Sequence, residues 1–327
     1  MPRRGKVPVF PDPAMIRDMT VLNAIGPVFL LMLTGALLHR SGRLCGDMVQ
    51  TLNWINYWVA LPALLIVKIS AAPPDFAGAG RAGAVVGGCA LLSLALCGPF
   101  IMLLKLKGPE LGAFLQAGFR GNLAFLALPV VIYSAAADVS AQRAALGALV
   151  LGVVVPLYNL ISVIVLLIGR HELGVRSIPL ILRKVFSNPL LIGCAIGLTL
   201  SWGDASLGLL LSRTLSAMGA FSLPTALLCI GGVIAEMGLR GRVLPACAAT
   251  MVKSVLTPFV GFLIARSCGL SEHEMIVTLL FLGAPSAVAG YVMAQQMGAD
   301  ESLAATSVML STLVSLGSMA VIVHLFA

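Results

Sequence analysis

Ten apolar runs, each able to form a helix that crosses a lipid bilayer, recur along this chain of 327 residues. A bilayer core of about 30 Å takes about 20 apolar residues as a helix. The sixth run is the shortest, because its residues would rise only about 22 Å at about 1.5 Å each, so a nine-helix alternative stays open. The runs lie near residues 20–38, 51–71, 82–104, 111–135, 143–169, 188–202, 215–237, 243–266, 273–297 and 302–326.

The balance of apolar and charged residues excludes an ordinary soluble protein. Hydrophobic residues make up 59% of the chain and charged residues only 10%, whereas soluble domains carry roughly 25% charged residues. We therefore predict an all-α polytopic membrane protein, with the lipid bilayer as its surroundings. The net charge of +8 does not indicate nucleic-acid binding, because the basic residues fall singly between apolar runs and form no patch.

The basic residues predict the orientation of the chain. Ten Lys and Arg residues fall in the loops after the odd-numbered runs, and eight fall on the other side, four of them in the N-terminal tail, residues 1–19. Cytoplasmic loops carry the excess of Lys and Arg, and charges far from the membrane count little. We expect both termini to be extracytoplasmic, residues 170–187 to form a short cytoplasmic linker, and the protein to lie in a bacterial inner membrane. We expect no cleaved signal peptide, and Met15 or Met19 is a candidate translation start.

The sequence also contains a weak internal repeat. Leu61-Pro62 in the second run corresponds to Leu223-Pro224 in the seventh, at an offset of 162 residues, and Pro99 in the third corresponds to Pro258 in the eighth, at an offset of 159. Similar offsets predict one five-helix module used twice, over 20–169 and 188–327. Because five is odd, the second copy must be inverted across the membrane.

Two runs carry residues that break a helix in the middle of the bilayer. The fourth contains Arg120, Gly121, Asn122 and Pro129, and the ninth contains Pro285, Ser286, Gly290 and Tyr291. Inverted repeats place their binding site where equivalent broken helices meet, and a broken helix leaves free N–H groups at one end and free carbonyls at the other. With the amide of Asn122 and the hydroxyl of Ser286, such a site suits a small carboxylate or a similarly polar solute. The alternative is that Pro129 and Pro285 only kink structural helices.

The charged residues deep inside the runs are two cations, Arg120 and Lys253, whereas the other charged residues of the runs lie near their ends. An intramembrane cation is costly unless it faces a polar cavity or an anion. For Arg120 we consider substrate contact or pairing with carbonyl groups, and for Lys253 attraction of an anion or a brace between the broken helices. No Asp or Glu lies centrally in any run, so a carboxylate proton relay is difficult to build. The sequence contains no P-loop, G-x-S-x-G or H-E-x-x-H motif, so we expect no enzyme, and the Cys and His spacing predicts neither a disulfide nor a metal site.

The chain resembles the auxin efflux carrier family of membrane transporters, which includes bacterial malonate-transporter-like proteins. The segment Leu52 to Pro62 is similar to the family's second helix, the spacing from Asn122 to Pro129 to its fourth, and Lys253 with Pro258 to its eighth. Pro285-Ser286, Tyr291 to Ala294, Gly298 and Asp300 are similar to its ninth helix and the turn that follows. The likeness extends from about residue 20 to 326.

The resemblance implies two inverted repeats of five helices, with helices four and nine crossing at the substrate site. Helices one, two, six and seven would form a scaffold, which often dimerises, and helices three to five and eight to ten a mobile transport domain. Plant members have a proline at the ninth-helix crossover where this chain has Gly290, and a long central loop where this chain has 170–187.

The function that we expect is therefore secondary transport of a mono- or dicarboxylate by alternating access through Asn122, Pro129, Pro285 and Gly290. We expect no cofactor. Uniport, a coupling Na⁺ held by carbonyls with Asn122 and Ser286, or a coupling H⁺ all stay open. The alternatives are a membrane sensor or receptor that binds a solute without moving it, and a channel.

Overall fold

The computed structural model describes residues 13–71, 75–135, 139–170, 187–203, 207–237 and 242–326, with side chains from residue 21 onward. Most of the predicted linker, 170–187, lies outside the described residues. The helices in chain order are α1 (Pro13–Arg40), α2 (Gly46–Ile55), η1 (Asn56–Ala60), α3 (Leu61–Ser70), α4 (Phe76–Leu104), α5 (Gly108–Phe119), η2 (Leu123–Ala127), α6 (Leu128–Tyr133), α7 (Ser140–Gly169), α9 (Pro189–Trp202), α10 (Leu209–Met237), α11 (Val243–Met251), η4 (Val252–Leu256), α12 (Thr257–Ser267), α13 (Glu272–Gly283), α14 (Val288–Gln296) and α15 (Glu301–Phe326).

Helical segments cover all ten predicted runs within the described ranges. Seven of them are long and apolar enough to cross a membrane: Val21–Arg40, Gly46–Ser70, Phe76–Leu104, Ser140–Gly169, Leu209–Met237, Val243–Ser267 and Glu301–Phe326. Pro189–Trp202 is a shorter apolar helix, and the fourth and ninth runs are each divided by a break. The all-helical fold and the multi-pass character are confirmed, whereas the exact ten-helix inverted repeat stays a prediction. The first helix begins at Pro13, inside the predicted tail.

Three prolines explain why three of these segments change their winding. Pro62, Pro129 and Pro258 are each the second residue of an α-helix that directly follows a five-residue π-helical turn, respectively η1, η2 and η4. A proline has no backbone N–H, and its ring clashes with the carbonyl four residues earlier. A π-helical turn widens the helix at that point and lets it continue.

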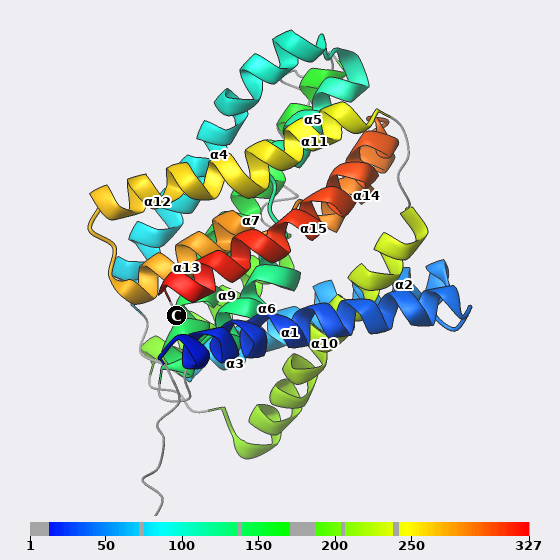
Figure 1. Cartoon of the computed structure of the whole chain (residues 1–327). Coiled ribbons are helices and arrows are strands. Elements are labelled where there is room, and N and C mark those ends of the chain that lie inside the picture. Colours follow the sequence, from blue (N-terminus) through cyan, green and yellow to red (C-terminus); the bar gives the residue numbers. More distant parts are fainter. Residues whose placement is uncertain are drawn as a thin grey trace, which may run out of the picture.

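The helices pack in two groups, which Figure 1 shows in its lower and upper parts. In one group α1 packs on α10, and α3 packs on both α9 and α10. In the other, α4, α5 and α7 pack on one another, while α13 packs on α4, α12 and α15. The groups meet where α1 contacts α6 and α15 and where α7 contacts α3 and α9. The division into scaffold and transport helices stays a prediction.

Glycine allows the closest helix crossing in the first group. A Cβ atom on Gly35 of α1 would overlap the carbonyl of Leu228 in α10, and one on Gly231 of α10 would overlap the carbonyl of Met32 in α1. Small residues let helix backbones approach in a bilayer, where burial of apolar surface gives little drive to association. The outer helix faces instead carry exposed large apolar side chains, such as Leu30, Met102 and Leu313, which is typical of a surface in contact with lipid.

Candidate functional site

The two helix breaks lie against each other in the middle of the second group. The first break is Arg120–Asn122, between α5 and η2, and the second is 284–287, between α13 and α14. Gly121 and Ser286 form an antiparallel bridge. The Asn122 N–H donates to the Pro285 carbonyl at 2.7 Å, and the Ala287 N–H donates to the Arg120 carbonyl at 2.9 Å. Backbone groups that the breaks release therefore satisfy one another inside the protein, as buried backbone requires.

Serine hydroxyl groups also form hydrogen bonds at the second break. The Ser286 N–H donates to the Ser311 hydroxyl of α15 at 2.9 Å, and the Ser286 hydroxyl donates to the Ala117 carbonyl of α5 at 2.7 Å. Ser311 and Ser315 are fully buried on α15. A series of Ser and Thr residues three or four apart within the last apolar run is the sequence signal that could have identified them.

Lys253 holds the end of the half-helix α13. Its side chain is fully buried, and its Nζ donates to the Leu282 carbonyl at 2.6 Å. It also packs against the first break, since a Cβ atom on Gly121 would lie 3.1 Å from Lys253 Cε. The last carbonyls of a helix carry partial negative charge and favour a cation. Of the two interpretations of Lys253, this geometry matches the brace between the broken helices.

Arg120 is the cation at the first break, and its side chain is 7% exposed. One Nη donates to Asn159 Oδ1 of α7 at 2.6 Å, and the other lies 2.6 Å from Met293 Sδ of α14. Among the residues that the structure describes, no carboxylate pairs with it. Its partners are neutral, so its charge is uncompensated in a place where an unpaired charge is costly.

A small cavity adjoins the bridge and is lined by Arg120 together with residues of α5, α14 and α15. Its volume of about 10 Å³ has room for about one water molecule. The other lining residues are Ala113, Gln116, Ala117, Ser286, Ala287, Gly290, Tyr291, Ala304 and Val308. The structure thus brings four of the predicted site residues, Arg120, Ser286, Gly290 and Tyr291, to one cavity.

The remaining predicted residues lie around this cavity and do not line it. Asn122 and Pro285 take part in the backbone bridge. Lys253 packs against this bridge at Gly121. Pro129 is in α6, beyond η2, so it widens the helix and does not form the break. Gly290 likewise lies in the first turn of α14, after the break has ended at Ala287. Of the residues named for the two breaks, Arg120, Gly121, Asn122, Pro285 and Ser286 therefore lie in them, whereas Pro129 and Gly290 lie in the helices that follow.

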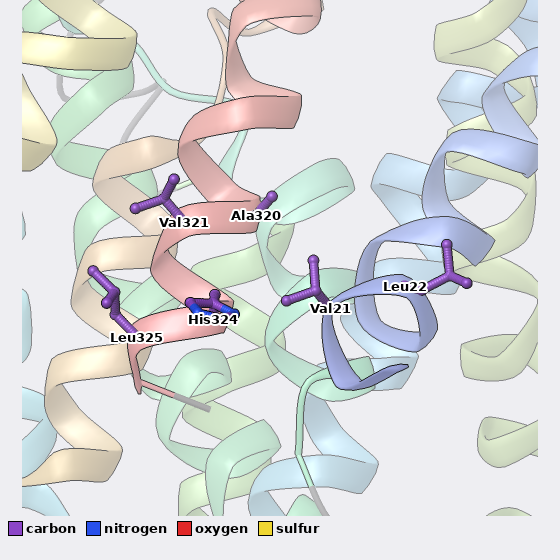
Figure 2. Close-up of a pocket in the computed structure, with 6 residues that line it drawn as sticks. All are labelled: Val21, Leu22, Ala320, Val321, His324 and Leu325. Carbon is purple, nitrogen blue, oxygen red and sulfur yellow. The ribbon is translucent and has the colours of Figure 1, made fainter. Parts of the chain in front are cut away.

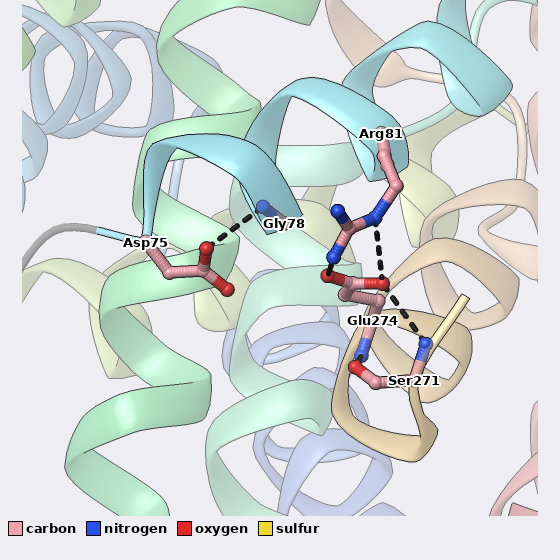
Figure 3. Close-up of polar contacts among 5 residues, drawn as sticks. All are labelled: Asp75, Gly78, Arg81, Ser271 and Glu274. Atoms are coloured by element: carbon pink, nitrogen blue, oxygen red, sulfur yellow. Dashed lines mark hydrogen bonds and ion pairs between the residues drawn. The ribbon is translucent and has the colours of Figure 1, made fainter. Parts of the chain in front are cut away.

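A second polar cluster ties the start of α13 to the start of α4 (Figure 3). Arg81 donates two hydrogen bonds to the carboxylate of Glu274, the shorter at 2.5 Å. Glu274 also accepts from the Ser271 N–H at 2.9 Å, while the Ser271 hydroxyl accepts from the Glu274 N–H, which is a capping box. These interactions fix the first turn of α13 and position the break that follows it.

An apolar crevice lies elsewhere, between α1 and α15, and is lined by Val21, Leu22, Ala320, Val321, His324 and Leu325 (Figure 2). It has one polar side chain and opens at the surface, far from both breaks in the sequence. Lipid chains suit such a crevice better than a polar solute does, so the candidate site is the cavity at Arg120.

Comparison with known protein families confirms the resemblance that the sequence suggested. The model of the family described as "Membrane transport protein" matches residues 20–323, nearly the whole chain. No curated protein matches the chain in a sequence comparison. The chain belongs to the membrane transport protein family, which is the family of the auxin efflux carriers.

Proposed function

We propose that this transporter is a secondary carrier of a small organic anion, a mono- or dicarboxylate, which binds where the fourth and ninth predicted spans cross. The observation that carries the proposal is the buried guanidinium of Arg120, which lines a cavity and has only neutral partners among the described residues. A bound anion would compensate this charge. The N-terminal end of α14 adds backbone N–H groups beside the same cavity, which also favour an anion.

Movement of the site across the membrane would occur by an elevator-like shift of one helix group against the other. Both breaks, the bridge and the cavity belong to the group of α4, α5, α7 and α11 to α15, so this group would move as the transport domain. Two ion pairs hold it together: Arg81 with Glu274, and Arg242 with Glu110 at 2.8 Å. The group of α1, α2, α3, α9 and α10 would be the scaffold.

The contacts of Lys253 favour uniport over coupling to sodium. Its ammonium group donates a hydrogen bond to the Leu282 carbonyl. This carbonyl is one of those at the end of a half-helix that a Na⁺ ion would use. The Ser286 hydroxyl is also engaged, by Ala117. Without a coupling ion, the membrane potential would drive an anion outward by about 2.3 kcal/mol per charge per 100 mV. Uniport therefore predicts efflux, whereas uptake would require Na⁺ or H⁺.

We further propose a homodimer in a bacterial inner membrane, formed through scaffold helices. The first half of α10 carries large apolar side chains that other described residues leave exposed: Leu209, Leu210, Leu211, Met218 and Phe221. A second copy would bury this face.

Exchange measurements on the purified protein in liposomes separate a carrier from the two alternatives. Vesicles loaded with unlabelled acetate, propanoate, malonate or succinate should take up the same labelled carboxylate by counterflow, and the rate should not change when Na⁺ is replaced by choline. Saturable binding without exchange would instead identify a sensor. A conductance that does not saturate with substrate would identify a channel.

A further inference from the structure

Gln116 lies in the last turn of α5, and its carbonyl accepts from the N–H of Arg120, the residue that ends this helix, at 3.0 Å. Its side chain is 2% exposed, and both residues line the cavity. The amide group lies over α14, since a Cβ atom on Gly290 would be 3.6 Å from both Cδ and Oε1 of Gln116.

The amide nitrogen of Gln116 has no hydrogen-bond partner within the described part of the chain, although it is buried. Native proteins pair the large majority of buried polar groups, because an unpaired one loses its hydration without compensation. Beside it, the Arg120 guanidinium has no negatively charged partner among the residues that the structure describes. The other lining side chains of α5 and the break are small: Ala113, Ala117 and Ala287.

We propose that the Gln116 amide and the Arg120 guanidinium together bind one carboxylate group of the transported anion. This inference rests on the proposed function and deepens it. A carboxylate presents two acceptor oxygens in one plane, so it can accept from both donors at once, and its single charge matches the single cationic side chain that lines the cavity. The cavity as described holds about one water molecule, so the segments that line it must move apart to admit the carboxylate.

The test separates a binding role of Gln116 from a structural one. The Gln116→Met variant keeps the length of the side chain and removes the unpaired donor, so the empty protein should unfold at a temperature equal to or above that of the wild type. Its affinity for the best bound carboxylate among acetate, propanoate, malonate and succinate, measured by calorimetric titration, should fall at least tenfold. Gln116→Glu supplies a carboxylate to Arg120 from within the chain, so it should raise thermal stability and abolish binding.

Ser307→Ala is the matched control, because the Ser307 hydroxyl is also buried with no hydrogen-bond partner in the described ranges but does not line the cavity. It should leave carboxylate affinity unchanged. If Gln116→Met binds with wild-type affinity while Arg120→Met loses binding, the proposed role of Gln116 is wrong and the anion site at Arg120 stands. Loss of thermal stability together with unchanged affinity would identify a structural residue. If the wild type binds none of the four carboxylates, the proposed function fails together with this inference.

Discussion

Asn122 lies at the bridge between the two broken helices, and its side chain is 5% exposed. Its backbone is fully engaged, since its N–H donates to Pro285 and its carbonyl accepts from Leu126 and Ala127. Its side-chain amide has no recorded hydrogen bond within the described ranges. A change of this side chain alone therefore leaves the bridge intact.

We predict that Asn122→Ala abolishes carboxylate counterflow, because the polar amide beside the bridge is lost, while yield and melting temperature stay near those of the wild type. Asn23→Ala, on the exposed face of α1, is the control and should transport normally. Counterflow in liposomes and a thermal melt of the same preparations provide the measurements. Normal transport by Asn122→Ala would show that Asn122 does not belong to the site.

At the level of single residues, the sequence predicts the break better than it predicts the cavity. Arg120, Asn122 and Ser286 were identifiable because a polar residue inside an apolar run must have a reason to be there. Gln116 and Asn159 also lie inside predicted spans but were missed. Their role depends on contacts between residues far apart in the sequence, such as Arg120 with Asn159 and with Met293.

Two ion pairs connect helices of the two predicted five-helix modules. Arg81–Glu274 joins the third predicted span to the ninth, and Arg242–Glu110 joins the eighth to the fourth. Exchange of the two five-helix modules converts one pairing into the other. This relation supports the inverted repeat independently of the proline offsets. The prolines themselves do not behave alike, because Pro62 follows a π-helical turn whereas its counterpart Pro224 lies within the α-helix α10.

The crossing of α1 and α10 gives a prediction at the level of elements. In Gly231→Ala the new methyl group would lie 2.7 Å from the carbonyl carbon of Met32, and overpacking of this kind costs about 1–3 kcal/mol. We expect a lower melting temperature. Gly317→Ala on α15 is the control, because a Cβ atom there meets nothing within 4 Å, and it should melt at or above the wild-type temperature. Equal melting temperatures for the two variants would contradict the close crossing.

The presence of a helix can be predicted from the length of an apolar run, and all ten predicted runs contain helical segments in the described structure. The type of helix is harder to predict from the sequence, because proline can be accommodated by a π-helical turn or by a kink within an α-helix. The two breaks lie at Gly121 and at Ala284–Ala287, away from Pro129 and Gly290. The pairing between the breaks decides these positions, and this pairing joins residues about 165 apart.

For the whole molecule, two natural cysteines test the proposed orientation. Cys45, after the first span, would face the cytoplasm, and Cys268, after the eighth, would face outward; both are exposed. In single-cysteine variants expressed in intact cells, a membrane-impermeant maleimide should label Cys268 and leave Cys45 unlabelled until the cells are opened. The reverse pattern would place both termini in the cytoplasm.

The proposed transport mechanism requires that the charge of Arg120, where the two broken helices cross, binds the transported anion. The most direct measurement is counterflow of a labelled carboxylate by Arg120→Met in liposomes, beside the wild type and Arg120→Lys. A hydrogen bond to a charged group contributes about 1.5–3 kcal/mol, so Arg120→Met should lose about 10- to 100-fold in exchange at low substrate concentration. Arg120→Lys keeps the charge and should retain part of it. Exchange by a correctly folded Arg120→Met at the wild-type rate would contradict an anion site at the crossed helices.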